Sequence, residues 1–113
     1  MKRTFVRLVQ LSIALCCASP VFASQGYYQG TVQAVEIVGG IAIITLVNGN
    51  GVQSCTAGEF WFDPTTDPGH SFLALAITAK AIGTTVYVQG NGTCTTAWPQ
   101  SNTEQAVTVS WSG

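Results

Sequence analysis

The sequence predicts a small, mostly β domain with one helix, arranged β-β-β-α-β-β as an OB-like Greek-key barrel. One segment, residues 67–83, has the signals of a helix, and short strand-like runs separated by Gly- and Asn-rich turns lie on both sides of it. Three strands before a helix and two or three after it is the element order of the OB-fold. The alternative is an open α+β sheet covered by one helix. A closed barrel is favoured because it hides the edges of a small sheet.

The first 23 residues have the pattern of a secretory signal peptide. A basic start precedes an apolar run over residues 8–18, and a small-residue site ends at Ala23. Cleavage near Ala23 would leave a single OB-like domain, residues 24–113, that is secreted or periplasmic. Because no later run reaches the roughly 18 apolar residues that span a bilayer, we expect no membrane anchor.

The mature chain is almost without cations. Lys80 remains after cleavage, against the five carboxylates of Glu36, Glu59, Asp63, Asp67 and Glu104, which gives a formal charge of −4. Affinity for nucleic acids depends largely on Lys and Arg contacts to phosphates. Nucleic acid is therefore excluded as an expected partner.

Two cysteines, Cys55 and Cys94, remain in the mature chain. An even pair in a small exported domain predicts a disulfide, which would stabilise the fold by roughly 3 to 5 kcal/mol. A redox or metal site is not favoured, because the chain has no CxxC motif and His70 is its only histidine. We expect no metal and no cofactor.

The helix prediction rests on its two ends. Asp67 is the expected N-cap, Pro68 follows at the first helical position, and Gly83 can adopt the left-handed conformation that ends a helix. Apolar residues at helical spacing form the expected core stripe: Phe72, Leu75, Ala76, Ala79 and Ile82.

A second apolar set, Leu73, Ala74, Ile77 and Ala81, lies on the flanks of that stripe. A helix that covers one sheet needs a single apolar stripe. Either these residues are simply tolerated at the surface, or a second face of the helix is buried against another subunit. Leu73, Ile77 and Ala81 are the candidate oligomer interface.

The expected strands before the helix are separated by glycine-rich turns. They cover residues 30–38, residues 41–47, and a third strand of two pieces, residues 52–55 and 59–62, with a bulge at Ala57-Gly58. Turns are expected at Gly39-Gly40 and over residues 48–51, because Asn and Gly accept positive φ angles.

The expected strands after the helix alternate apolar and polar residues. They cover residues 84–89, residues 93–98 and residues 105–111, with a turn at residues 90–92 and a loop at residues 99–103. Tyr87 then points to the opposite side from Val86 and Val88.

Four features of this order resemble one toxin family. They are the secretory leader, Cys55 after the second strand, Trp61 before the helix, and the run of residues 79–85 leading into a Val-rich strand. This pattern is similar to that of the B subunits of bacterial toxins built from one A and five B subunits, the subtilase cytotoxin and pertussis-like group. The resemblance implies a pentameric ring, with the helix lining the channel and a glycan-binding outer face. The family's Ser-centred sialic-acid pocket and second disulfide have no counterpart, so no binding residue is transferred.

Candidate catalytic residues are few. Asp63, Asp67 and His70 are the best polar cluster, but Asp67 is explained as a helix cap and Asp63 as a turn former. We therefore expect that the protein is not an enzyme.

Aromatic side chains offer a stronger argument for binding, because flat rings stack on sugars and anchor protein contacts. Trp61 and Trp111 are expected in the core, whereas Tyr87 and Trp98 are the candidate ligand contacts. The sequence thus predicts a secreted, non-enzymatic binding domain for a glycan or a protein receptor. The alternative is a stand-alone structural or inhibitor-type protein that binds another protein through a sheet edge.

Overall fold

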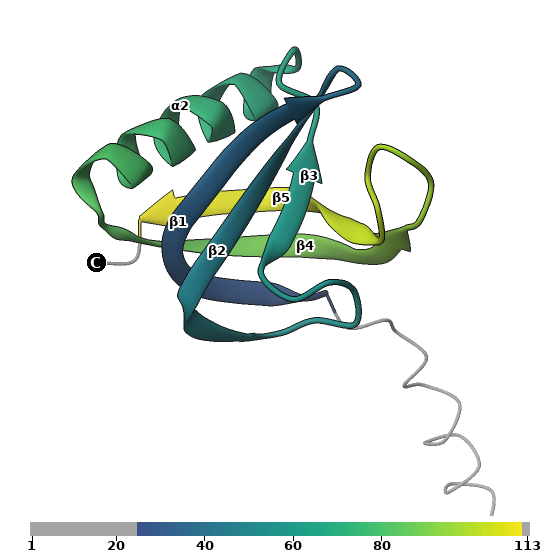
Figure 1. The fold of residues 1–113 in the computed structure, drawn as a ribbon, viewed down its shortest axis with the longest axis horizontal. Helices are drawn as coiled ribbons and strands as arrows, with labels where there is room; N and C mark the ends of the chain where they lie inside the picture. Colours follow the sequence, from purple (N-terminus) through teal and green to yellow (C-terminus); the bar gives the residue numbers. More distant parts are fainter. Residues whose placement is uncertain (1–24, 112–113) are drawn as a thin grey trace, which may run out of the picture.

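A computed structural model describes residues 25–111, so the predicted leader and its cleavage site lie outside the described residues. The elements are β1 (Tyr27–Val38), β2 (Ile41–Val52), β3 (Glu59–Phe62), α2 (Asp67–Ile82), β4 (Thr85–Thr95) and β5 (Thr103–Trp111), as Figure 1 shows. The predicted mostly β fold, with one helix between the third and fourth strands, is confirmed for this part of the chain.

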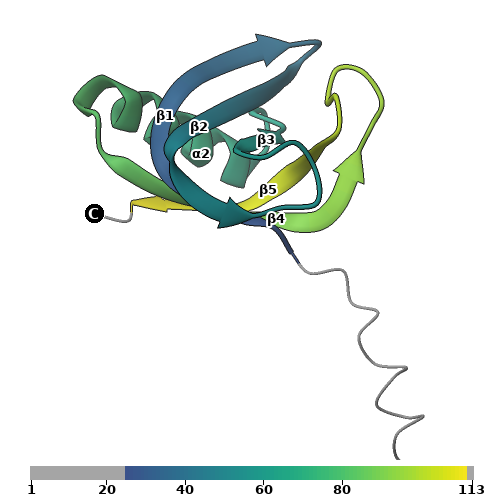
Figure 2. The ribbon, with the colours of Figure 1, turned by 60° about the horizontal axis from the view of Figure 1, so that its bottom comes forward.

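The five strands form a closed barrel in the order β1-β2-β3-β5-β4. All neighbours are antiparallel except β3 and β5, which pair in parallel over only two residue pairs. The first residues of β1 lie along β4, and the whole of β1 pairs with β2, so β1 closes the barrel (Figure 2). This order and the place of the helix are consistent with the predicted OB-like barrel.

The second strand is longer than predicted, and the turn expected at residues 48–51 is wrong. β1 begins at Tyr27 rather than at Gly30, and Tyr27 pairs with Val52 at the far end of β2. Asn48 has the positive φ (58°) that the sequence suggested, but it lies at a register shift within the β1–β2 ladder. The left-handed residue therefore bends a continuous strand instead of ending it.

The same correction applies after the helix. The expected turn at residues 90–92 lies inside one strand, β4, whose pairing with β5 shifts register on both sides of Gly90. Gly92 has φ 86°, so the glycines make a bulge.

The third strand is shorter than predicted. Only Glu59–Phe62 pairs as β3, and residues 53–58 form a loop that ends at Gly58 with φ 80°. The interruption predicted at Ala57-Gly58 is therefore the start of the strand rather than a bulge within it.

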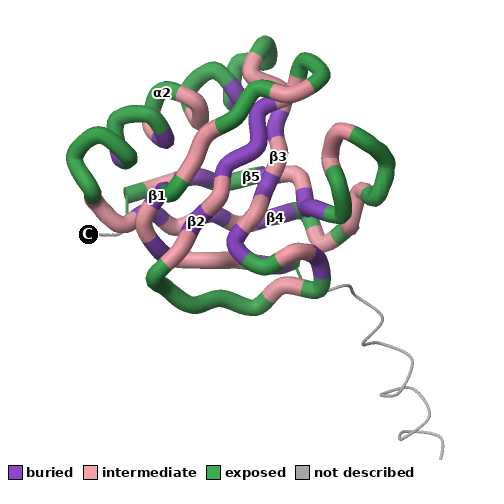
Figure 3. The backbone as a smooth tube through the Cα atoms, in the orientation of Figure 1, coloured by how far each residue is buried: buried purple, intermediate pink, exposed green. Residues whose placement is uncertain are grey.

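The core fills the inside of the barrel, with the helix packed over one end (Figure 3). Phe60, Ile44, Val86 and Val88 are fully buried there, and α2 contributes Ala76 and Ala79, each 0% exposed. The core stripe predicted for the helix is wrong at its end, because the side chain of Ile82 is 65% exposed.

The N-cap of α2 is Thr66 rather than Asp67. The Thr66 side-chain oxygen accepts a hydrogen bond from the backbone N–H of Gly69 at 3.1 Å, and Asp67 lies within the first turn. The predicted C-terminal glycine is confirmed, since Gly83 has φ 73° and donates its N–H to the carbonyl of Ala79.

The predicted disulfide is confirmed. Cys55 and Cys94 are bonded, which joins the loop between β2 and β3 to the end of β4, and Cys55 is only 8% exposed. A buried disulfide indicates an oxidising compartment, extracellular or periplasmic. Over residues 25–111, no helix has the length and apolarity needed to cross a membrane.

Candidate functional site

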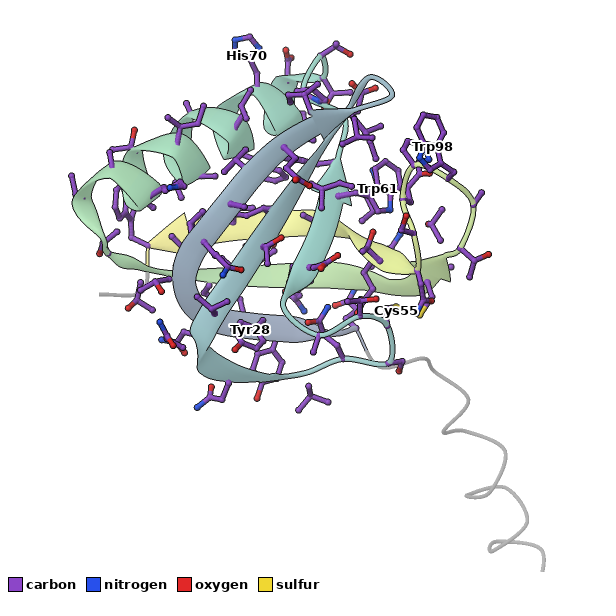
Figure 4. The ribbon with its side chains drawn as sticks, viewed as in Figure 1. Tyr28, Cys55, Trp61, His70 and Trp98 are labelled. Carbon is purple, nitrogen blue, oxygen red and sulfur yellow. A yellow bond between two sulfur atoms is a disulfide. The ribbon has the colours of Figure 1, made fainter. Side chains whose placement is uncertain are left out.

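The polar cluster considered for catalysis forms a turn and a helix start. The Asp63 carboxylate accepts hydrogen bonds from the hydroxyl and the backbone N–H of Thr65, at 2.6 and 2.9 Å. Both hydrogen bonds stabilise the charged carboxylate, so they hold the pKa of the Asp63 carboxyl below its ordinary value. The bond from the Thr65 hydroxyl has the larger effect and the bond from the backbone N–H the smaller one. His70 is exposed on α2 and points away from the barrel (Figure 4). Within the described residues, no three His, Cys, Asp or Glu side chains group as metal ligands.

The described part of the chain has no pocket. Small-molecule sites are typically concave and bury most of the ligand. The exposed aromatic side chains are the other candidate ligand contacts, because flat rings can bind a ligand on an open surface.

Trp98 lies in the loop between β4 and β5 and is 74% exposed. This loop packs against the turn between β1 and β2. A Cβ atom on Gly39 would come within 2.9 Å of Pro99 Cγ and 3.2 Å of Trp98 Cη2. The Trp98 ring therefore lies where the β4–β5 loop contacts the β1–β2 turn.

Trp61 lies beside this loop and outside the barrel. Its neighbours Phe60 and Phe62 are buried in the core, so the Trp61 side chain faces outward from β3, against the prediction of a core position. Its partner on β2, Ile43, is 8% exposed yet is not part of the core cluster. We call Gly39, Ile43, Trp61, Trp98 and Pro99 the loop patch.

The indole nitrogen of Trp61, Nε1, is buried and has no hydrogen-bond partner. Trp61 and Trp98 lie on the same side of the molecule, between β3 and the β4–β5 loop (Figure 4). The loop patch therefore contains the exposed ring of Trp98 and the buried N–H of the Trp61 ring, which has no hydrogen-bond partner.

Tyr87 lies on a second surface, on the outside of the sheet formed by β2, β1, β4 and β5. Its ring packs against that of Tyr27, with centroids 5.9 Å apart and planes inclined by 27°. Across the strands, Gln29 pairs with Tyr87 and with Asn50, and Tyr87 pairs with Ser110. The outward side chains around this pair, which we call the sheet face, are Tyr27, Gln29, Asn50, Val52, Tyr87, Gln89 and Ser110.

The structure does not bring the two predicted ligand contacts together. Tyr87 is near the start of β4, and Trp98 follows the end of that strand at Thr95. Eight residues and the bulge around Gly90 separate Tyr87 from Thr95. Tyr87 and Trp98 therefore belong to separate surfaces. Tyr28, next to Tyr27, points inward and packs against the core.

The predicted oligomer residues divide between two environments. Leu73 is half-buried and packs against the core of its own barrel, whereas Ile77 is 53% exposed and Ala81 is also exposed. Trp111, expected in the core, is 46% exposed at the end of β5.

The fold and the disulfide define a small barrel domain suited to an oxidising compartment. No protein-family model, curated protein or solved structure matches the chain. Tyr27 is one of the aromatic residues whose exposure the sequence leaves open, and Gln29 was missed. Both precede the predicted first strand, and only strand register places them beside Tyr87.

Proposed function

We propose that the protein is an exported, non-enzymatic binding domain that contacts a glycan or a protein receptor through exposed aromatic side chains. The observation that carries this proposal is the 74% exposure of Trp98 on a loop packed against a neighbouring turn. A Trp ring is a large contact surface with few rotatable bonds, so it binds at a low entropic cost. The signal-peptide pattern of the first 23 residues and the buried disulfide support export.

Trp98→Ala tests this proposal on an array of glycans, with the wild-type mature chain as the reference. We expect wild-type binding to a subset of glycans, and a change in Trp fluorescence on titration with the same sugars. Where the ligand contacts the loop patch, Trp98→Ala should weaken binding by about tenfold or more, as for an interface hot spot. Thermal unfolding midpoints of the two proteins provide the control for folding.

The absence of glycan binding in this experiment would distinguish between the two proposed functions. A chain that binds no glycan, and instead captures a protein through its sheet edge, would support the inhibitor-type function and contradict glycan binding. A chain that binds neither class of ligand would overturn the proposed function.

The resemblance to toxin B subunits adds the proposal that the chain assembles through α2. Ile77 is exposed on this helix and is the candidate contact between copies. We expect a pentamer by size-exclusion chromatography with light scattering, and we expect Ile77→Glu to convert it to a monomer, because burying an unpaired carboxylate is costly.

Ser71→Glu is the matched control for assembly. Ser71 is also exposed on α2, but it lies about 120° around the helix from Ile77, so its charge would stay in water. Loss of the pentamer in Ile77→Glu alone supports the interface. A wild-type chain that is a strict monomer removes the toxin-B-like assembly and favours the stand-alone function.

A further inference from the structure

We infer that the sheet face, centred on Tyr27 and Tyr87, is a platform for an uncharged saccharide chain. This inference rests on the proposed function, since it names the ligand class and chooses between the two aromatic surfaces. Four properties of the sheet face lead to it: its aromatic centre, its lack of charge, its amide and hydroxyl groups, and its shape.

The two tyrosine rings leave aromatic surface open. Their planes are nearly parallel, but the 5.9 Å between their centroids is too long for a face-on stack, in which carbon atoms lie about 3.5–4.0 Å apart. The rings are therefore offset, so neither ring fully covers the other. Both side chains are half-buried, so they are held in place while still reaching solvent.

The sheet face has no charged side chain. The cation of the mature chain, Lys80, lies on α2, and the carboxylates of Glu36, Glu59, Asp63, Asp67 and Glu104 are also elsewhere. An anionic sugar would find no cationic side chain on this surface and would approach a protein of negative formal charge. The surface is thus matched to a neutral ligand, in contrast to the sialic acid that the toxin resemblance would imply.

The groups around the rings are those that hydrogen-bond hydroxyls. Gln29, Asn50 and Gln89 each carry both a donor and an acceptor, as do sugar hydroxyl groups. Gln89 Nε2 already donates to Gln25 Oε1 at 2.7 Å, which fixes one amide at the edge of the tyrosine pair. Thr31 and Thr85, paired across β1 and β4, extend this uncharged surface along the strands.

The shape of the surface selects a chain rather than a single sugar. The described residues contain no pocket, and a monosaccharide on an open sheet would bury too little of its surface to bind firmly. A polysaccharide can place successive residues over the tyrosines and the flanking amides. Several weak contacts then add within one ligand.

Affinity gel electrophoresis with a matched pair of polymers tests the inference. Dextran and galactomannan are the neutral probes, and dextran sulfate is the anionic partner with the same backbone as dextran. We expect at least one neutral polymer to retard the wild-type mature chain, and dextran sulfate not to do so. Tyr87→Ala should weaken the retardation by about tenfold, since a ring contact supplies about 1.4 kcal/mol.

Three further variants separate stacking from folding and from the loop patch. Tyr87→Phe keeps the ring and should retain binding, and Gln29→Ala should weaken it without removing any ring. Trp98→Ala, in the loop patch, should weaken binding of the neutral polymer less than Tyr87→Ala does. If Tyr87→Ala unfolds, as judged by its near-ultraviolet circular dichroism, Gln29→Ala provides the same comparison.

The outcomes distinguish this inference from the proposed function. Binding that is lost in Trp98→Ala but kept in Tyr87→Ala overturns the sheet face and leaves the glycan-binding function in place. Stronger binding to dextran sulfate overturns the neutral specificity. Failure of every neutral polymer to bind overturns the inference, and the glycan and receptor assays of the loop patch then decide the proposed function independently.

Discussion

Replacing Cys55 and Cys94 together by serine is expected to lower the free energy of unfolding by about 4 kcal/mol. The two cysteines are 39 residues apart in the sequence, so their bond closes a long loop of the unfolded chain. Without the bond the unfolded state gains that loop's conformational freedom, whereas the native contacts stay the same. The free energy of unfolding of a small domain is only about 5–15 kcal/mol, so the double substitution would remove a large part of it.

Urea denaturation of the mature chain measures this effect, with the wild type, the double serine variant and the reduced wild type compared under one buffer. Ser54→Ala, at an exposed neighbour of Cys55, is the control and should be neutral. A loss below about 1 kcal/mol would contradict the prediction. It would mean that the unfolded chain keeps the ends of this loop close together even without the disulfide.

The sequence located the residues of special backbone geometry better than it located the ends of strands. Asn48 and Gly92 do have positive φ angles, but both lie within strands rather than at turns. A left-handed residue fits a turn and a bulge equally well. The choice depends on whether a partner strand lies opposite, and the partner of Asn50, Gln29, is outside the strand that local signals predicted.

The two ends of α2 were predicted with different success. Gly83 was predicted correctly as the C-terminal residue, because only a left-handed glycine explains the end of the apolar pattern. The prediction of Asp67 as the N-cap is wrong, because the residue before it, Thr66, is also of a type that caps helices. The structure selects Thr66, whose hydroxyl also donates to the Asp63 carbonyl at 2.9 Å and so links the preceding turn to the helix.

The candidate surfaces were only partly visible in the sequence. Alternation along β4 correctly placed Tyr87 on the outside, since Val86 and Val88 are buried. The register of β1 against β4, which brings Tyr27 to Tyr87, involves residues 60 apart in the sequence and has no local signal. Glu104 was counted only as a negative charge, although it is one of the most buried side chains of the barrel.

Glu104→Ala is expected to destabilise the barrel by about 3–5 kcal/mol. The Glu104 side chain is 1% exposed, and its Oε1 accepts hydrogen bonds from the backbone N–H groups of Gly26 and Gly92, at 3.0 and 2.8 Å. Alanine leaves both donors without this partner, the buried Gly26 N–H and the partly buried Gly92 N–H, at up to about 1–3 kcal/mol each. Glu104→Gln should cost less, because its amide oxygen can still accept both bonds.

A double-mutant cycle with Gly26→Ala tests whether the carboxylate is the reason for a glycine at that position. A Cβ atom on Gly26 would collide with Glu104 Oε2, and its other close contact is Gln53 Cγ, 2.9 Å away, in a side chain whose amide is hydrogen-bonded to Gly58 and Glu59. Gly26→Ala should therefore destabilise the wild type, and it should cost less once Glu104 is alanine. Urea denaturation of the four proteins should give a coupling of about 1–3 kcal/mol, as expected for residues in contact. Strictly additive losses would contradict this account, because the glycine would then be needed for a reason other than the buried carboxylate.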